Sequence, residues 1–340
     1  MPASNTIRVV RWLVGILLGA SAVAGAQPAS FDDELRRGLV ALQNSRLTEA
    51  QQSLEQASRL QPANPKVWMA LAQVFLRNRQ PGPANAAAKR AETLAGDDPV
   101  IQRALGIFYS ESRDFSKAAA MARHDEGFAF ELGQGLLQRG DFSGALGFFD
   151  AAQKHFPNSA QIALGYGVAA YGERRFADAI DAFLNVIRID ASVEQPYVFL
   201  SRLLDQAGDK LERITAAYAA WEKAAPRNCL PVCLHAKALA AAGGDAAEIE
   251  AELRRSIQLN DAYWESHYEL GVLLARNRRW EAAATELKRG IELNPKHAAA
   301  HFQLARVYEK LGKPELAQVE RAEHERLTAA ETNVGGDPPR

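Results

Sequence analysis

Two cysteines, Cys229 and Cys233, are the residues whose type and spacing most directly suggest chemistry. In an oxidising compartment the two thiols could form a disulfide. Four residues apart on a helix, their Cα atoms would lie about 6 Å apart, which a disulfide permits, but their Cβ atoms would point in unfavourable directions. Three interpretations stay open: a disulfide, two inert core thiols, or a metal site that includes His235. The CxxxC spacing does not favour a redox catalyst.

The spacings that mark common catalytic sites are missing: the sequence has no GxSxG elbow, no HExxH pair and no phosphate loop ending in GK[ST]. Gly165 and Gly167 superficially resemble a dinucleotide loop, but no strand precedes them. His297 and His301 are four apart, yet no acidic or Cys partner is near in sequence, which favours a surface pair over metal ligands. Since no set of acid, base and nucleophile can be named, we expect a protein that is not an enzyme and uses no cofactor or metal.

Small residues recur about every 34 positions, and this period predicts the elements that position all other side chains. Counting from Phe31, the eighth place of each period holds Gly38, Ala72, Gly106, Gly133, Gly167, Ser201, Ala236, Gly271 and Ala305. The twentieth place holds Ala50, Ala84, Ala118, Ala145, Ala179, Ala283 and Ala317. Two helices can cross closely only where no large side chain intervenes, so the period predicts a stacked array of helix pairs.

The residues around these small positions resemble the tetratricopeptide repeat (TPR) family, whose pattern is W-x2-L-G-x2-Y, then A-x3-F, A and P. The matching residues are Trp68, Leu71, Ala72, Phe75, Ala84 and Ala91 in one period, and Leu270, Gly271, Leu274, Ala283, Leu287, Gly290 and Pro295 in another. The resemblance implies an all-α, right-handed superhelical solenoid of about nine TPR-like helix-turn-helix units. The expected units are 31–64, 65–98, 99–125, 126–159, 160–193, 194–228, 229–263, 264–297 and 298–328.

Three units depart from the pattern. Unit 99–125 is short, so its second helix must lose about one and a half turns. Units 194–228 and 229–263 are each one residue longer than the period, and an extra residue in their turns would place Ile214 and Ile249 where Ala is usual. We expect a bend near residues 205–250.

Both ends of the chain differ from the array. Residues 1–26 carry Arg8 and Arg11, an apolar run and the small residues Ala24-Gly25-Ala26, which is typical of a secretory signal peptide. An uncleaved membrane anchor is the alternative, but the run is shorter than the roughly 20 residues that span a bilayer. We expect an exported chain, periplasmic or extracellular. The last helix should end near Leu327, with a disordered tail at 329–340.

The resemblance also implies a binding surface on the first helix of each pair, at its second, fifth, sixth, ninth, twelfth and thirteenth positions. We call these side chains the first-helix face. They include Met69, Gln73, Arg77, Arg103, Phe130, Gln134, Tyr171, Phe199, Arg202, Lys237, Tyr268, Arg276, Phe302, Arg306 and Lys310. Aromatic and aliphatic residues interleaved with cations suit a bound peptide, although the rings could equally pack in the core.

We therefore expect a non-catalytic interaction scaffold that binds a protein or peptide along a concave groove outside the cytoplasm. The alternative is an accessory subunit of a cell-envelope polysaccharide or export enzyme complex. A net charge of −1 gives no sign of a nucleic-acid partner.

Overall fold

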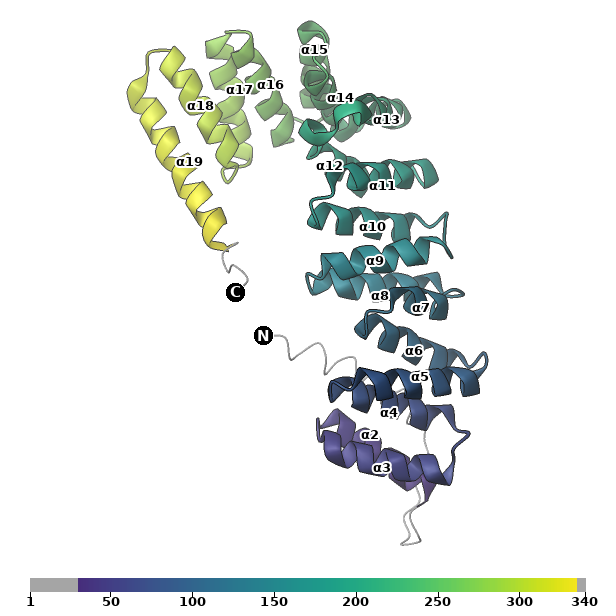
Figure 1. Ribbon diagram of the computed structural model, residues 1–340. Helices are drawn as coiled ribbons and strands as arrows, with labels where there is room; N and C mark the ends of the chain where they lie inside the picture. The colour runs from purple at the N-terminus through teal and green to yellow at the C-terminus, as the bar shows by residue number, and fades with distance from the viewer. Residues whose placement is uncertain (1–29, 335–340) are drawn as a thin grey trace. The chain divides into compact units, whose positions relative to one another are not determined.

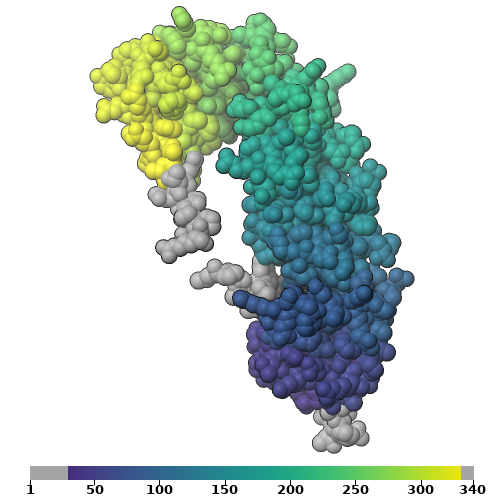
Figure 2. Space-filling view, viewed as in Figure 1, coloured from purple at the N-terminus to yellow at the C-terminus, as the bar shows by residue number. Residues whose placement is uncertain are grey.

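A computed structural model of the chain describes residues 30–334, and these residues form helices and no strand, which confirms the all-α prediction. The described residues form two compact bodies, divided between Arg175 and Phe176 and called here the N-terminal and C-terminal bodies. Within each body, successive helices lie side by side and their side chains fill the spaces between them (Figures 1 and 2). Among the described residues, no helix combines the length and hydropathy of a membrane span.

The helices of the N-terminal body are α2 (Phe31–Gln43), α3 (Leu47–Leu60), α4 (Pro65–Arg77), α5 (Pro81–Ala95), α6 (Pro99–Glu111), α7 (Phe115–Met121), α8 (Glu126–Gln138), α9 (Phe142–Gln153) and α10 (Ala160–Gly172). Those of the C-terminal body are α11 (Phe176–Ile189), α12 (Gln195–Ser201), the 3-10 turns η1 (Leu204–Gln206) and η2 (Gly208–Lys210), α13 (Leu211–Ala224), α14 (Cys229–Ala241), α15 (Ala246–Leu259), α16 (Trp264–Arg276), α17 (Trp280–Leu293), α18 (Ala298–Lys310) and α19 (Pro314–Val334). The even-numbered helices from α2 to α18 are the first helices.

Short turns join the two helices of a pair, and most of them reverse the chain through one residue with a left-handed backbone. These residues are Ser45, Arg79, Arg113, Gly140, Arg174, Gly243, Arg278 and Gly312. Glycine adopts a positive φ without steric cost, whereas the arginines adopt it at a cost of about 1–2 kcal/mol each. The tight reversal therefore recurs along the array even where its sequence signal, glycine, is missing.

Side-chain caps begin several first helices. The side chains of Asn64 and Asp98 accept hydrogen bonds from the backbone N–H groups of Lys66 and Val100, 3.1 and 2.9 Å away. A proline follows each cap at the first helical position, where its missing N–H is no loss. The Asn-Pro and Asp-Pro pairs thus fix where α4 and α6 begin.

The small residues allow the two helices of a pair to cross closely, as predicted. A Cβ atom added to Gly133 of α8 would lie 2.3 Å from Cζ of Phe149 in α9. One added to Gly271 of α16 would lie 2.6 Å from Cγ of Leu287 in α17. Both distances are far inside van der Waals contact, so a larger side chain would force the helices apart.

A recurring hydrogen bond joins the start of a first helix to the chain that precedes it. The side chain at the fourth position of the unit reaches the carbonyl oxygen six residues earlier. The pairs are Trp68–Pro62 (2.8 Å), Gln102–Gly96 (3.2 Å), Tyr197–Ala191 (3.2 Å), His267–Asp261 (3.0 Å) and His301–Pro295 (3.1 Å). A carbonyl oxygen only accepts, so the side chain donates in every case. Four residue types therefore perform one structural task.

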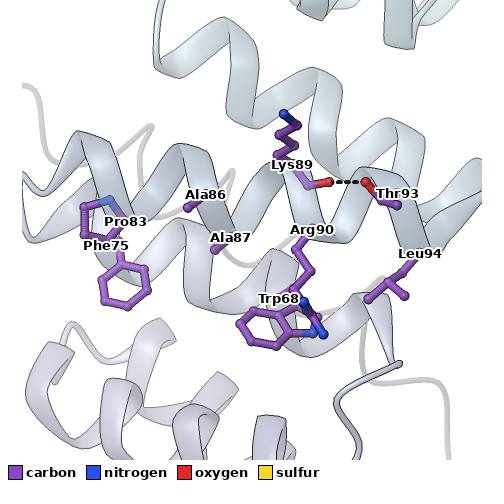
Figure 3. Close-up of a pocket in the computed structure, with 9 residues that line it drawn as sticks. All are labelled: Trp68, Phe75, Pro83, Ala86, Ala87, Lys89, Arg90, Thr93 and Leu94. Carbon is purple, nitrogen blue, oxygen red and sulfur yellow. Dashed lines mark hydrogen bonds between the residues drawn. The ribbon is translucent and has the colours of Figure 1, made fainter.

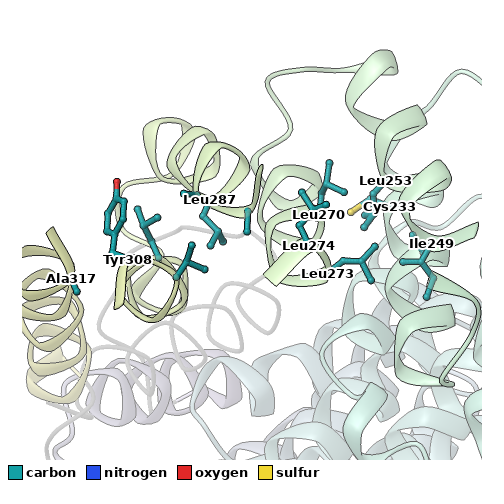
Figure 4. Close-up of a cluster of buried hydrophobic side chains, with 14 residues drawn as sticks. Cys233, Ile249, Leu253, Leu270, Leu273, Leu274, Leu287, Tyr308 and Ala317 are labelled. Carbon is teal, nitrogen blue, oxygen red and sulfur yellow. The ribbon is translucent and has the colours of Figure 1, made fainter. Parts of the chain in front are cut away.

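The C-terminal body holds a continuous core between α14 and α19 (Figure 4). Leu253, Leu270 and Leu287 have 0–1% of their surface exposed, and Cys233 lies among them at 0%. Each buried leucine contributes about 1.5–3 kcal/mol relative to an exposed one. The core passes from pair to pair, so neighbouring pairs stabilise one another.

Helix α7 confirms the prediction of a shortened second helix. It has seven residues, against 14 in α3 and 15 in α5, and α8 begins only five residues after α7 ends. Compared with α3 and α5, α7 therefore lacks about two turns of helix.

The extra residues of the two long units lie in different places. Between α14 and α15 the turn has four residues, 242–245, as expected. In unit 194–228 the connection between the helices is longer than predicted, because α12 itself ends at Ser201 and two 3-10 turns follow before α13. Leu203 and Ala207 in this stretch are 1% and 3% exposed. Their burial holds the chain in a conformation that a regular first helix would not allow.

Helix α19 runs to Val334, so the expected helix end near Leu327 and the disorder predicted for 329–334 were wrong. The segment from Thr328 to Val334 contains no glycine or proline, and its alanines and glutamate favour helix. The next glycine in the sequence, Gly335, lies beyond the described residues. The predicted signal peptide at 1–26 also lies outside them.

Candidate binding groove

The first-helix face of the N-terminal body is more closed than the sequence suggested. Met69 is fully buried and Gln73 is 3% exposed, so neither was correctly assigned to an open surface. Both lie on α4, which packs directly against the neighbouring first helices α2 and α6. Close approach of three first helices buries the fifth and ninth positions of this unit, which the family pattern leaves open.

Gln73 and Arg77 take part in a polar network inside this body. Gln73 donates from Nε2 to Oε2 of Glu111 over 3.1 Å, and Arg77 donates from Nη1 to the carbonyl oxygen of Leu42 over 3.1 Å. Burial raises the pKa of the Glu111 carboxyl, against the opposing effects of Gln73, Arg77 and Arg139. Burial also lowers the pKa of Arg77. These side chains serve contacts between helices.

Arg103 is engaged in the same way. Its Cζ lies 4.1 Å from the ring centre of Phe128, and its guanidinium pairs with Asp125 at 3.3 Å and Glu131 at 2.5 Å. The aromatic side chains of this face are also partly covered: Phe130 packs 6.5 Å from Phe149, centre to centre. Tyr171 is half-buried, and Gln134 is exposed.

Another hollow of the N-terminal body lies between α4 and α5 (Figure 3). It measures about 650 Å³ and is lined by Trp68, Phe75 and Arg90 among others. Arg90 places Cζ 4.8 Å from the ring centre of Trp68. The sequence placed Trp68 and Phe75 only in the repeat pattern. That pattern does not show whether an aromatic ring is half-buried, as both of these are, or fully buried.

In the C-terminal body, two predicted residues lie on one open surface: Phe199 on α12 and Arg202 directly after it. Phe199 stacks on Phe183 with ring centres 4.8 Å apart and planes 8° apart. Arg202 is exposed, with Cζ 6.0 Å from the Phe199 ring. Both line a hollow of about 440 Å³ together with Glu194, Gln195 and Val198. Phe199 and Arg202 therefore share one accessible surface.

Lys237 is the centre of a partly buried charge cluster between α14 and α16. Its Nζ lies 2.7 Å from Oε1 of Glu265 and 3.5 Å from Oε1 of Glu269. Burial lowers the pKa of Lys237, but the two carboxylates outweigh it and hold the pKa above its usual value. Burial raises the pKa of Glu269, and proximity to Glu265 adds to this effect. Lys237 is therefore committed to neighbouring residues.

Tyr268, Phe302 and three cations complete the face at α16 and α18. Tyr268 is half-buried, with its ring centre 4.6 Å from that of His297. Phe302 is 42% exposed, and Arg306 places Cζ 5.8 Å from its ring. A hollow of about 210 Å³ between the two helices is lined by Val272, Ala275, Arg276, Trp280, Gln303, Arg306, Val307 and Lys310. This hollow brings Arg276 and Arg306 together, as the sequence predicted for one face.

Cys229 and Cys233 are free thiols in the structure, so the disulfide is not formed. Cys233 is fully buried in the core, and burial raises the pKa of its thiol well above the usual value. His235 pairs through Nδ1 with Glu222 at 2.7 Å. Within the described residues, no group of three or more His, Cys, Asp or Glu side chains is arranged to hold a metal ion. His301 is occupied by Glu320 and the Pro295 carbonyl.

Several solved structures are similar to this chain at low sequence identity. MamA from Desulfovibrio magneticus RS-1 is 13% identical, with a TM-score of 0.35, over 64% of this chain and 97% of that chain. YrrB, described as a TPR protein with an unusual peptide-binding site, is 17% identical, with a TM-score of 0.35, over 63% of this chain and 91% of that chain. Yeast Tom70 is 16% identical, with a TM-score of 0.44, over 94% of this chain and 65% of that chain. The comparison with curated proteins gives no match.

The comparison with protein families identifies the repeats directly. The family model described as tetratricopeptide repeat matches residues 35–99, 130–194 and 268–325, which is more than half of the chain. The unmatched stretches hold the short unit 99–125 and the two long units, whose spacing departs from the pattern. Together with the paired helices and the small residues at their crossings, these matches confirm the resemblance seen in the sequence. The chain belongs to the tetratricopeptide repeat family.

Proposed function

We propose that this protein is a non-catalytic scaffold that binds a protein or peptide along its first-helix face. TPR proteins bind protein or peptide partners, and the family membership supports the general role. The observation that carries the location of the site is the contrast between the two bodies. Met69 and Gln73 are buried and Arg103 is ion-paired within the N-terminal body. In the C-terminal body Arg202, Arg276, Phe302 and Arg306 are exposed, and the three arginines line hollows.

Such a surface binds without the cost of folding, because the helices hold its side chains in place before the partner arrives. Phe199 and Phe302 supply aromatic area, and the neighbouring arginines supply fixed charge. Both arginines lie beside a ring within 6.0 Å, an arrangement common in the energetic centres of protein interfaces.

Site-specific photo-cross-linking tests the location. A photoreactive amino acid is placed singly at Arg202, Arg276 and Phe302, and at the exposed control positions Thr285 and Lys288 on the second helix α17. The proposal expects one cross-linked polypeptide from the three first-helix positions and none from the controls. Equal cross-linking from both sets, or cross-linking only from α17, would contradict it.

We also propose that the protein acts outside the cytoplasm, on the basis of the sequence of residues 1–26. Expression of the full chain in a bacterial host tests this. The proposal expects a chain in the periplasmic or external fraction that begins at Gln27. An intact chain that begins at Met1 and stays in the cytoplasmic fraction would contradict it.

A further inference from the structure

The hollow between α16 and α18 combines an apolar floor with a cationic rim. Trp280, Val272 and Val307 form apolar walls, and Val307 is 1% exposed. Arg276 ends α16, and Arg306 and Lys310 lie four residues apart on α18, so they occupy one face of that helix. All three cations are exposed.

None of these three cations makes an ion pair with any residue that the structure describes. Other cations in the same body do: Arg279 pairs with Glu250 at 2.6 Å and Arg289 with Asp261 at 2.8 Å. Two carboxylates near these cations have other partners. Glu309 pairs with Arg321, and Glu269, which feels the charge of Arg276, is bound by Lys237. The rim therefore keeps a local excess of positive charge.

This excess is a local feature, because the whole chain has a net charge of −1. General attraction of polyanions is thus not expected. Like charges that line one hollow repel one another, and an anionic group placed among them relieves the repulsion. Two guanidinium groups favour carboxylates, which they bind with two parallel hydrogen bonds.

We propose that this hollow binds an acidic peptide segment in which an apolar side chain, flanked by Asp or Glu, enters the floor while the carboxylates meet Arg276, Arg306 and Lys310. The volume of about 210 Å³ is below that of pockets for drug-sized ligands, about 300–1,000 Å³, and suits one side chain. This inference rests on the proposed function, since it names the class of partner that the first-helix face binds.

Fluorescence anisotropy of the full chain tests the inference with two labelled probes, Ser-Glu-Glu-Leu-Glu-Glu-Ser and its amide analogue, in which Gln replaces every Glu. We expect the acidic probe to bind about tenfold or more tightly than the amide probe, and to weaken as salt is added. The double variant Arg306→Glu/Lys310→Glu should lose about tenfold or more in affinity for the acidic probe.

The matched control is Lys288→Glu/Lys296→Glu, which makes the same change in net charge on exposed residues outside the hollow. It should keep affinity for the acidic probe within about twofold. Arg276→Gln and Lys310→Gln provide milder variants if the reversal of charge disturbs folding, and each should weaken the acidic probe alone. Circular dichroism establishes that each variant is folded.

Equal binding of the two probes, or equal loss in the hollow and control variants, would overturn the inference. Failure of the acidic probe to bind at all would also overturn it. If the cross-links at Arg276 and Phe302 persist in that case, the proposed function stands and only the acidic class of partner is wrong. If those cross-links are missing as well, the proposed function fails too.

Discussion

His267 of α16 is hydrogen-bonded to Glu286 of α17, with Nδ1 2.8 Å from Oε2. The other ring nitrogen, Nε2, donates to the Asp261 carbonyl oxygen at 3.0 Å, so both nitrogens face acceptors. An imidazole satisfies two acceptors only when both nitrogens carry protons. Burial lowers the pKa of His267, but Glu286 and Asp261 outweigh it and raise the pKa above its usual value. The pair thus links two helices with a charge that depends on pH.

The first prediction concerns pH and Glu286→Gln. Because the folded state raises the pKa of His267, its contribution is complete below the unfolded value of about 6.5 and is lost as pH rises through the folded value. Glu286→Gln should therefore cost about 1.5–3 kcal/mol near pH 5.5, and distinctly less near about pH 9. The midpoint of urea unfolding, compared with the wild type at both pH values, measures this.

Glu281→Gln is the control for that experiment, since Glu281 is exposed on the same helix and holds no side-chain partner in the described residues. It should shift the midpoint little at either pH. Equal destabilisation by Glu286→Gln at both pH values would show that the charge on His267 contributes nothing.

The second prediction concerns the crossing of α8 and α9. Gly133→Ala should destabilise the protein by about 1–3 kcal/mol, because the new methyl group would lie 2.3 Å from the Phe149 ring. Gly82→Ala is the matched control: Gly82 lies in α5 with no atom within 4 Å of the added Cβ, so alanine should stabilise by up to about 1 kcal/mol. Thermal unfolding measures both changes. A neutral Gly133→Ala would mean that the helices do not need a small residue at their crossing.

The third prediction concerns the left-handed turn residues. Arg278 has a φ of 59°, whereas Gly312 takes the same place in the next turn with a φ of 68°. Arg278→Gly should stabilise by about 0.5–1 kcal/mol, since relief of strain exceeds the entropy that glycine adds to the unfolded chain. The reverse change, Gly312→Ala, should destabilise by about 1 kcal/mol, because open space surrounds the residue and only backbone strain is added. Denaturant midpoints that move in the opposite directions would contradict this account of the turns.

The fourth prediction concerns the two thiols. Cys233 is fully buried and Cys229 is partly exposed, so a thiol reagent should label Cys229 first and reach Cys233 only when the array opens. Mass spectrometry of the labelled native chain, before and after denaturation, counts the modified cysteines. Equal rates of labelling in the native protein, or a non-reduced chain two mass units lighter, would contradict two independent free thiols.

The sequence predicted most of the helix pairs because their signals are local. Gly133, Gly271 and the other small residues mark the crossings, while Asn64-Pro65 and Asp98-Pro99 mark helix starts. Each pair contacts mainly its neighbours, so no long-range information was needed. The end of α12 at Ser201 escaped prediction, because it depends on how Leu203 and Ala207 pack rather than on a breaker residue at that point.

The candidate site was harder to predict, because exposure depends on distances between neighbouring helices. Met69 and Phe302 are both apolar residues at groove positions, yet one is fully buried and the other is 42% exposed. Arg103 and Arg306 are both arginines on this face, yet only Arg103 meets carboxylates from another helix. The repeat pattern gives the position of a side chain on its helix, and it does not give the partner that the adjacent helix supplies.

Amide hydrogen exchange tests the central claim most directly, which is that the first helices bind the partner. Exchange in the full chain is measured with and without the polypeptide recovered by cross-linking at Arg276. We predict slower exchange in Trp264–Arg276 and Ala298–Lys310, with little change in Trp280–Leu293 and Pro314–Val334. Slower exchange confined to the second helices would contradict the account.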